Sequence, residues 1–540
     1  MHQSFKQFAV LILSILLLLA HTATAQQQIT PETILSRMGQ ALGGMEKLRA
    51  VENLYMRGKV EVAGLSGTVD DWQTARRQHR QIVDLGEVYK QTTIFDGTRG
   101  WVVDKNNQIS DLAGITLEKE ILSNYVGSFS YLFTDRMPGT ITAGGEDPSG
   151  KYYLLRFKPK GGAEATYAVD KSTFLPFSMA VASKNGNTTT YFDDWREVDG
   201  IKLPFRYRQI EPDPSNNALV QQESVQLNTT IAATSFMRPQ PSTPDFHFTN
   251  RQNFARIPID VDDNAIFVRG WINRSAPLWF ILDTGASTTV IDARRARALG
   301  LKSAGKIGGS GSGGRIEVKF TKGVNFTLPG VSLMNQTVAS LPFRKEVTGI
   351  RPNFGGILGY DFISRFVMEI DYANKTLTLH DPKSYQYKGA GKRLPITIDD
   401  TPFIQAEVKV SGHDPVPGRF EIDTGYDGAL TLYGPFVKAH PILAPTATSD
   451  PGVRQGLGQS LKSVKSQVES VAFGGFSFAN VVTDFPVAEG GSEGDHDVSG
   501  LIGNEILRRF KVIFDYSRQE MILEPNVHLT DPFKTNTGGL

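Results

Sequence analysis

The chain has 540 residues, of which 40% are hydrophobic and 21% are charged, a balance that excludes a mostly disordered or collagen-like protein. Its formal net charge of +1 gives no reason to expect a nucleic acid as partner. Cysteine is absent, which excludes disulfide scaffolds, thiol catalysis and cysteine-based metal sites, and at ~100–200 residues per domain the length predicts two to four domains.

The N-terminus has the pattern of a secretory signal. Lys6 precedes an apolar run over 8–20, and Ala23-Thr24-Ala25 has the A-x-A form of a cleavage site. The run is shorter than the ~20 residues of a membrane-spanning helix, and no later run approaches that length. We therefore expect residues 1–25 to be a signal peptide, and the mature chain to be exported, periplasmic or secreted, without an integral membrane span.

Residues 26–233 are predicted to form an α+β domain. Apolar residues at helical spacing, among them Ile34, Met38 and Leu42, predict a helix over 31–50. Short alternating strands with turn signals such as Asp199-Gly200 follow and predict a curved antiparallel sheet with the helix across it. The pattern is similar to the periplasmic lipoprotein-carrier fold, which implies lipid or lipoprotein contact. No polar cluster in this region suggests catalysis.

A proline-rich segment over 234–250 predicts a linker, because Pro239, Pro241 and Pro244 stand there among Ser, Thr and Asn. It separates the expected front domain from a second half with a different sequence pattern.

The second half contains an internal duplication. Similar blocks recur in the same order about 140 residues later, a period too long for a solenoid. The repeat predicts two lobes, over 251–388 and 389–530. The paired blocks are 256–263 with 393–400, 280–285 with 420–425, 356–359 with 500–503, and 366–372 with 510–516.

Each repeat carries an Asp-Thr-Gly tripeptide after an alternating apolar strand. One copy is typical of a turn at a strand end. Two equivalent copies in a duplicated body instead predict two loops that face each other. Carboxyl groups at ~3 Å cannot both ionise, so they share a proton and offer a base for water and an acid for a carbonyl oxygen. Gly permits close approach, and the Thr hydroxyl can bond across the axis.

The tripeptides and their surroundings resemble the active-site loops of aspartic peptidases. The two loops read Asp283-Thr284-Gly285-Ala286-Ser287 and Asp423-Thr424-Gly425-Tyr426-Asp427. Ile357-Leu358-Gly359 and Leu501-Ile502-Gly503 resemble the apolar-apolar-Gly strand beneath each loop. The compact lobes are closer to retropepsin-like bacterial enzymes than to pepsin. The resemblance implies a mainly β fold, a bilobal pair of double-psi acid-protease barrels.

The resemblance also implies roles for individual residues. Asp283 and Asp423 would be the catalytic dyad. Ser287 would hydrogen-bond the outer oxygen of Asp283. The loops would be supported by Thr284, Gly285, Thr424 and Gly425.

The second loop departs from the first, because Asp427 stands where the first loop has Ser287. A like charge beside Asp423 predicts a raised titration of the dyad and a less acidic activity optimum. Alternatively, Asp427 points outward and has no effect.

A glycine-rich segment over 306–315 lies where the family has its flap. Gly309, Ser310 and Gly311 are predicted to form a mobile lid that contacts the substrate backbone. No Tyr lies in this segment, so the pepsin-type flap Tyr is missing, and a plain surface loop is the alternative. Residues 452–460 hold the corresponding place in the second repeat.

These observations predict an exported aspartic endopeptidase, a single-chain and monomeric hydrolase of polypeptide substrates. No cofactor and no metal is expected, because the nine His are scattered and Asp495-His496-Asp497 is typical of a solvated loop. Two alternatives remain open. The chain is a non-catalytic peptide- or lipoprotein-binding protein on a peptidase scaffold, or its lobes pair between chains to give a dimeric enzyme.

Overall fold

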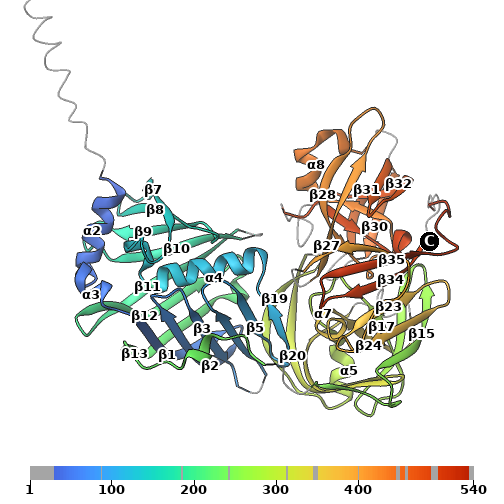
Figure 1. Ribbon diagram of the computed structural model, residues 1–540, viewed down its shortest axis with the longest axis horizontal. Helices are drawn as coiled ribbons and strands as arrows, with labels where there is room; N and C mark the ends of the chain where they lie inside the picture. Colours follow the sequence, from blue (N-terminus) through green and yellow to red (C-terminus); the bar gives the residue numbers. More distant parts are fainter. Residues whose placement is uncertain are drawn as a thin grey trace, which may run out of the picture.

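The computed structural model describes residues 29–86, 88–183, 186–240, 244–311, 314–343, 351–398, 401–445, 450–455, 460–487 and 497–533. The expected signal peptide, 1–25, lies outside these residues, as do parts of both expected flaps. The described chain is mainly β, as expected, and its strands form a thirteen-stranded, a fourteen-stranded and an eight-stranded sheet. Figure 1 shows the first sheet and its helices beside the other two sheets. None of the helices in these ranges is long and apolar enough to cross a membrane.

The helix predicted over 31–50 is two helices, α2 (Pro31–Ala41) and α3 (Met45–Arg49). Thr30 caps α2 by accepting a hydrogen bond from the backbone amide of Thr33. The break falls at Gly43 and Gly44, whose φ values of 128° and 102° no helix contains. The prediction of one continuous helix was therefore wrong at this glycine pair.

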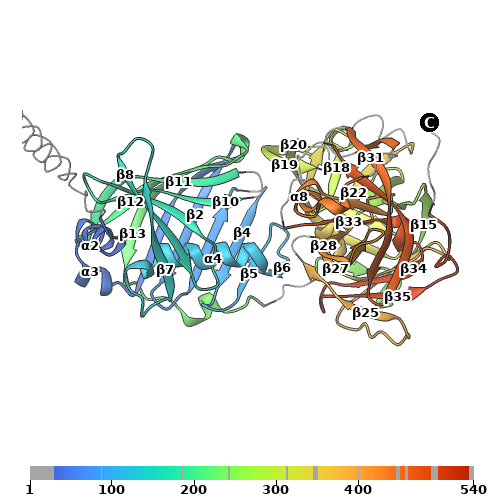
Figure 2. The same ribbon diagram turned by 90° about the horizontal axis from the view of Figure 1, so that it is seen from above.

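The first sheet is antiparallel throughout and curves around a helix. Its order is β6-β5-β4-β3-β2-β1-β13-β12-β11-β10-β9-β8-β7. Helix α4 (Gly114–Gly127) contacts both β2 and β8, which lie far apart in this order, and Figures 1 and 2 show it across one face of the sheet. The strands are β1 Asn53–Val62, β2 Leu65–Thr74, β3 His79–Asp84, β4 Lys90–Phe95, β5 Gly100–Val103, β6 Ile109–Asp111, β7 Gly139–Glu146, β8 Tyr152–Pro159, β9 Ala165–Asp170, β10 Pro176–Ser183, β11 Gly186–Val198, β12 Ile201–Ile210 and β13 Ala218–Leu227. Short 3₁₀ turns are η1 Ser130–Leu132, η2 Pro214–Asn216 and η3 Ala233–Phe236.

Where strands β2 and β3 meet α4, a buried polar cluster joins the sheet to the helix. His79 lies between the carboxylates of Glu120, which it contacts through Nδ1, and Asp71, whose Oδ2 is 3.0 Å from Nε2. Gln81 and Gln73 donate to the Asp71 carboxylate at 2.9 and 3.2 Å. No sequence pattern indicated this cluster, because its three ionisable residues come from two strands and a helix.

The first repeat of the second half forms a closed ring of six strands. The ring order is β16-β17-β22-β18-β21-β20, and β20 pairs back with β16. The elements are β14 Phe246–Phe248, β15 Phe254–Asp262, β16 Ala265–Ile272, β17 Leu278–Leu282, β18 Val290–Asp292, α5 Ala293–Ala298, β19 Ser303–Gly311, β20 Gly314–Leu328, β21 Val331–Leu341, β22 Phe354–Leu358, α7 Tyr360–Ile363, β23 Val367–Asp371 and β24 Thr376–His380.

The second repeat has the same ring. Its order is β27-β28-β33-β29-β32-β31, and β31 pairs back with β27. The elements are β25 Lys392–Pro395, β26 Thr397–Ile398, β27 Pro402–Lys409, β28 Val416–Ile422, β29 Leu430–Leu432, α8 Gly434–Ala439, η4 Pro441–Leu443, β30 Asp450–Gln455, β31 Ser460–Phe473, β32 Phe476–Pro486, β33 Gly500–Ile502, α9 Asn504–Leu507, β34 Phe510–Asp515 and β35 Glu520–Pro525.

The two repeats are joined through one continuous sheet. Strand β23 pairs with β34 in antiparallel register, from Val367 opposite Asp515 to Asp371 opposite Lys511. A single apolar core runs through both repeats and includes Phe280 and Phe420, which are fully buried. Each such side chain contributes about 1.5–3 kcal/mol to the free energy of unfolding, so the core fixes the repeats to each other.

Candidate active site

Asp283 follows the end of a central strand of the first ring. Strand β17 lies parallel to β22, with Leu282 opposite Leu358. The backbone amide of Asp283 donates to the carbonyl of Leu358 at 3.1 Å. Because both strands are paired on both sides, the carboxylate starts from a rigid backbone.

Asp423 occupies the same position in the second ring. Strand β28 lies parallel to β33, with Ile422 opposite Ile502. The backbone amide of Asp423 donates to the carbonyl of Ile502 at 3.0 Å. The predicted apolar-apolar-Gly strands therefore lie beside the Asp-Thr-Gly strands in both repeats.

The two Asp-Thr-Gly loops interlock through their threonines. The backbone amide of Thr284 donates to Oγ1 of Thr424, and that of Thr424 donates to Oγ1 of Thr284, each at 3.0 Å. Oγ1 of Thr284 in turn donates to the carbonyl of Ile422 at 2.6 Å, and Oγ1 of Thr424 to that of Leu282 at 2.9 Å. Both threonines are fully buried, so four bonds shielded from water hold the loops together.

The glycines allow the carboxylates to come together. The amide of Gly285 donates to Oδ1 of Asp283 at 2.9 Å, and that of Gly425 to Oδ1 of Asp423 at 2.7 Å. A Cβ on Gly285 would lie 2.6 Å from Cγ of Asp423, and one on Gly425 would lie 2.4 Å from Cγ of Asp283. Any side chain here would collide with the opposite carboxylate, which explains why glycine occupies both positions.

The two carboxyl groups are buried close to each other, and the pKa of each is shifted upward. Burial, then the charge and hydrogen bond of Asp423, raise the pKa of Asp283 well above the usual carboxyl value. Burial also raises the pKa of Asp423, against the opposing effect of the Gly425 amide. The pair therefore retains a proton above the normal carboxyl range, the arrangement that general acid–base chemistry needs.

Ser287 and Asp427 hold equivalent positions in the two loops, and both are exposed. Ser287 is exposed, and within the described ranges no hydrogen bond joins it to Asp283, so its assignment to the outer oxygen is not supported. Asp427 is also exposed, and it contacts the first repeat through its backbone carbonyl, which accepts from Asn264 at 2.9 Å. Desolvation of the carboxyl, then the charges of Asp263 and Asp484, raise the pKa of Asp427. The dyad is not the source of this shift, which favours the alternative in which Asp427 has no effect on the dyad.

Asp361, which the sequence analysis missed, supports the first loop from below. It accepts from the Thr288 hydroxyl at 2.8 Å and from the Thr289 amide at 2.6 Å. Nζ of Lys105 lies 3.6 Å from the same carboxylate, and both side chains are nearly buried. Burial acts to raise the pKa of Asp361, but Lys105 and the Thr289 hydrogen bond together hold it below the ordinary value. The only sequence signal was its position after Gly359.

Asn504 supports the second loop. Its Nδ2 donates to the carbonyl of Thr424 at 2.6 Å, and its Oδ1 accepts from the Tyr372 hydroxyl at 2.6 Å. The contact with Tyr372 ties the second loop to the first repeat. Tyr426, in the place of Ala286, donates to the buried Asp484 at 2.6 Å. Asn504 and Asp484 belong to none of the repeated motifs, so no sequence signal pointed to them. Tyr372 lies in a repeated block and Tyr426 in the second active-site loop, but nothing in these motifs indicated their contacts.

The predicted flap is a β-hairpin of β19 and β20. Gly309 pairs with Ile316, Ser310 with Arg315 and Gly311 with Gly314, so all three predicted flap residues lie on β19 next to the hairpin tip. On β20, Ile316 and Val318 pack against the same apolar cluster as Ala286 of the first active-site loop. The hairpin therefore rises directly beside the dyad loop, as a covering element would. The central part of the second expected flap, 456–459, lies outside the described residues.

The outer edge of this hairpin is covered by the front sheet. The amide of Lys306 donates to the carbonyl of Ala63 at 2.7 Å. The amide of Gly308 donates to Oδ1 of Asn216 at 2.9 Å, and Nδ2 of Asn216 donates to the carbonyl of Gly308 at 2.9 Å. Figure 2 shows β19 and β20 at the junction between the two halves. An otherwise open strand edge thus finds its partners in the other half of the chain.

A turn between β5 and β6 makes a second bridge. Asn106, which is buried, donates through Nδ2 to the carbonyl of Thr337 at 3.0 Å and accepts from the Thr337 amide at 2.8 Å. Asn106 and Lys105 together fix this turn to the first repeat, near Asp361, which supports the loop of Asp283. The two halves are therefore in contact at both the hairpin and the floor of the site.

Comparison with known families finds a match over part of the first repeat. Residues 268–362 match the family model described as aspartyl protease. The match includes the first Asp-Thr-Gly and Ile357-Leu358-Gly359, and it marks an aspartyl-protease-like region. A search of curated proteins found no match.

Two similar solved structures each cover 38% of this chain. One is a DUF1329 family protein from Desulfovibrio piger, with 12% identity, a TM-score of 0.28 and 96% of its own chain covered. The other is described as a putative outer membrane lipoprotein-sorting protein domain from Vibrio parahaemolyticus, with 9% identity, a TM-score of 0.27 and 95% of its chain covered.

Proposed function

We propose that the chain is an exported aspartic endopeptidase that hydrolyses peptide bonds with water activated by Asp283 and Asp423. The observation that carries this proposal is the reciprocal bonding of Thr284 and Thr424, which brings two equivalent carboxylate loops face to face. The aspartyl-protease match over 268–362 supports the same assignment for the first repeat. The signal-like sequence over 1–25 motivates the periplasmic or secreted location.

The proposal includes a domain division. A front domain would span 26–233 and a linker 234–250, followed by peptidase lobes at 251–388 and 389–530. The two equivalent six-stranded rings support a bilobal pair of double-psi barrels, with the dyad at the junction. The lobes would act within one monomeric chain, since the loops of both repeats already meet in it. The front domain would contact lipid or lipoprotein.

The shared proton of the dyad defines the proposed reaction. The ionised carboxylate takes a proton from a water molecule, whose oxygen then bonds to the carbonyl carbon of the peptide. The protonated carboxyl gives its proton to the carbonyl oxygen, which yields a tetrahedral diol. The newly protonated carboxyl then gives its proton to the amide nitrogen, while the other carboxylate takes a proton from one hydroxyl of the diol. The C–N bond breaks, an amine and a carboxylic acid are released, and the dyad again holds one proton. The raised pKa of Asp283 keeps the acid form available in this cycle.

The test is cleavage of a dye-quenched denatured protein by the mature chain between pH 3 and pH 8. Asp283→Asn and Asp423→Asn are each expected to abolish cleavage, because one carboxylate alone lacks its acid or base partner. Asp414→Asn, an exposed aspartate of the second repeat, is the matched control and should retain full activity. Cleavage that survives both dyad variants would refute the proposal. A folded but inactive parent that still binds peptides would favour the binding-protein alternative.

A further inference from the structure

Strands β21 and β32 are equivalent in the two repeats. Each follows a hairpin glycine of positive φ, Gly330 at 90° and Gly475 at 84°. Each also carries an asparagine in the left-handed region, Asn335 at 53° and Asn480 at 54°. These markers align Val331–Leu333 with Phe476–Phe478.

In the first repeat, the edge formed by Val331–Leu333 is covered by β14. Phe246 pairs with Leu333 and Phe248 with Val331 in antiparallel register. The amide of Met334 donates to the carbonyl of Asp245 at 3.0 Å. Strand β14 is thus a short strand added to the edge of β21 by a segment that precedes the repeat.

A buried arginine fixes this added strand. Nη2 of Arg365 donates to Oδ2 of Asp245 at 2.7 Å, and its Nε donates to Oδ1 at 3.0 Å. The ring of Phe246 lies 4.8 Å from that of Phe366, the residue after the arginine. The bound segment therefore combines an acidic residue with apolar residues at alternate positions.

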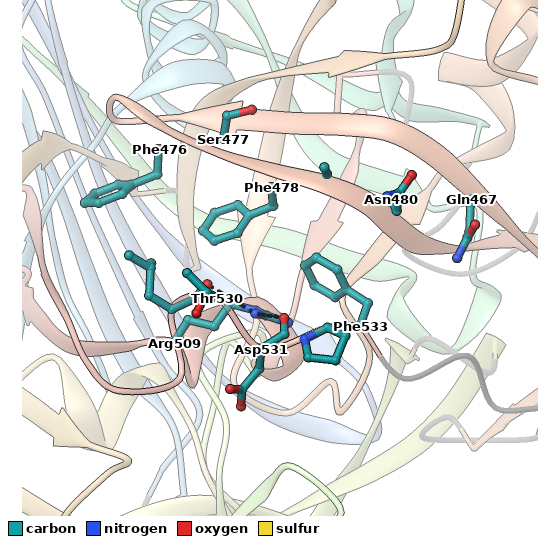
Figure 3. Close-up of a pocket in the computed structure, with 12 residues that line it drawn as sticks. Gln467, Phe476, Ser477, Phe478, Asn480, Arg509, Thr530, Asp531 and Phe533 are labelled. Atoms are coloured by element: carbon teal, nitrogen blue, oxygen red, sulfur yellow. Dashed lines mark hydrogen bonds between the residues drawn. The ribbon is translucent and has the colours of Figure 1, made fainter.

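The second repeat keeps the arginine and the phenylalanine that receive β14 in the first repeat, and its own Phe476 packs against Phe510 with ring centroids 4.8 Å apart. Arg509 and Phe510 stand where the first repeat has Arg365 and Phe366, after equivalent short helices. Among the described strands, none pairs with the corresponding edge of β32 at Phe476–Phe478. A cavity of about 440 Å³ lies there instead (Figure 3). Its lining includes Phe476, Phe478, Ala479, Arg509 and Phe533.

Arg509 retains a donor for an incoming carboxylate. Its side chain is 1% exposed, and its Nε donates to the carbonyl of Glu505 at 3.0 Å. Nη1 donates to carbonyls of the segment 528–531. Nη2 lies 3.5 Å from the Glu505 carboxylate but makes no hydrogen bond within the described ranges. In the first repeat, the equivalent Nη2 of Arg365 donates to the Asp245 carboxylate.

We propose that this cavity binds an extended acidic segment of another polypeptide, which adds a strand to β32 and places a carboxylate against Nη2 of Arg509. Backbone hydrogen bonds along a free strand edge give such segments affinity, and the side-chain pockets give selectivity. The volume lies in the range of ligand sites. Because β32 itself supplies Phe476 and Phe478, the apolar residues of the segment can be smaller than those of β14. This site is separate from the dyad and does not depend on peptidase activity.

The first repeat supplies the probe. The probe is a labelled peptide with the sequence of residues 244–250, Pro-Asp-Phe-His-Phe-Thr-Asn. A second peptide carries Val in place of both Phe residues. Each peptide is titrated into the full chain carrying Asp283→Asn. Fluorescence anisotropy measures binding, and hydrogen exchange locates it. We expect saturable binding of at least the Val version, with protection over 476–480.

Peptide variants separate strand addition from nonspecific adhesion. Asn in place of the peptide Asp should weaken binding at least tenfold, because the charged bond to Arg509 is lost. Methylation of the His backbone nitrogen should abolish binding, because it removes a strand hydrogen bond. Ala in place of the exposed His should change the affinity less than twofold.

A protein variant tests the location without disturbing the buried arginine. Ala479 is exposed and lines the cavity, so Ala479→Trp should fill the cavity and abolish binding while the chain stays folded. Ala182→Trp, on the outer part of the front sheet, should bind as the parent does.

Absence of binding, or protection elsewhere, would overturn the proposal. Binding that requires removal of 534–540 would assign the cavity to the chain's own tail, and chain dimers dissociated by the peptide would assign it to a second copy. Both results would also overturn it.

Discussion

Asn216 and Gly308 exchange two hydrogen bonds of 2.9 Å across the junction of the front sheet and the hairpin beside the dyad. An asparagine side chain here takes the place of a neighbouring strand. Each bond contributes about 0.5–1.5 kcal/mol, so the pair governs how easily the hairpin edge opens.

Asn216→Ala is expected to raise hydrogen exchange at Gly308 about tenfold, because the amide loses its acceptor and the carbonyl its donor. The measurement is native-state exchange read by mass spectrometry. Asn187→Ala, an exposed asparagine on β11, is the control and should leave exchange in the hairpin unchanged. Equal exchange in parent and Asn216→Ala would mean that other contacts hold this edge.

Thr424→Val is expected to destabilise the fold by about 2–4 kcal/mol, because the Thr284 amide and the Leu282 carbonyl lose their partner in a fully buried place. Thr424→Ser keeps the hydroxyl and removes one methyl, so about 1 kcal/mol of loss is expected. Denaturant unfolding measures both. Similar losses in the two variants would show that packing, not the interlocking bonds, dominates at this position.

The dyad should make the fold less stable as the pH rises. The pKa of Asp283 is higher in the folded chain than its unfolded value of about 3.9. Its stabilising contribution to the free energy of unfolding is therefore fully present below about pH 3.9, and it is lost as the pH rises through the folded pKa. Asp283→Asn mimics the neutral form, so it should be more stable than the parent at pH 7 and similar at pH 3. Unfolding curves at both pH values check this, and a variant less stable than the parent at pH 7 would contradict it.

The duplication made much of the candidate site predictable. Two equivalent Asp-Thr-Gly strands have few ways to bury their apolar faces except in equivalent rings, so the meeting of Asp283 with Asp423 followed from the sequence alone. The supporting contacts did not. Lys105 and Asp361 are far apart in the chain and belong to no periodic pattern, so only tertiary packing brings them together. The single helix predicted over 31–50 failed for a local reason, because two glycines of positive φ interrupt it.

Lys105→Met should destabilise the junction by about 3 kcal/mol, because it leaves the Asp361 carboxylate nearly buried without its ammonium partner. The folded pKa of Asp361 lies below its unfolded value, so its contribution is present above about pH 4 and is lost as the pH falls through the folded pKa. Lys90→Met breaks the exposed pair with Asp84 and should cost at most about 1 kcal/mol. Thermal unfolding at pH 7 compares the two, and equal losses would contradict the role of burial.

His79 should make the stability of the front sheet fall at alkaline pH. Burial disfavours the charged ring, but the carboxylates of Glu120 and Asp71 raise its pKa to about 10. Since the folded pKa exceeds the unfolded value of about 6.5, the stabilisation is fully present below pH 6.5 and is lost as the pH rises towards 10. His79→Gln removes the cation between two carboxylates, so it should be less stable than the parent at pH 6, and the gap should close by pH 10. Denaturant unfolding at intervals between these values gives the difference curve. A constant difference would mean that the ring is neutral in the folded chain and that its role is packing alone.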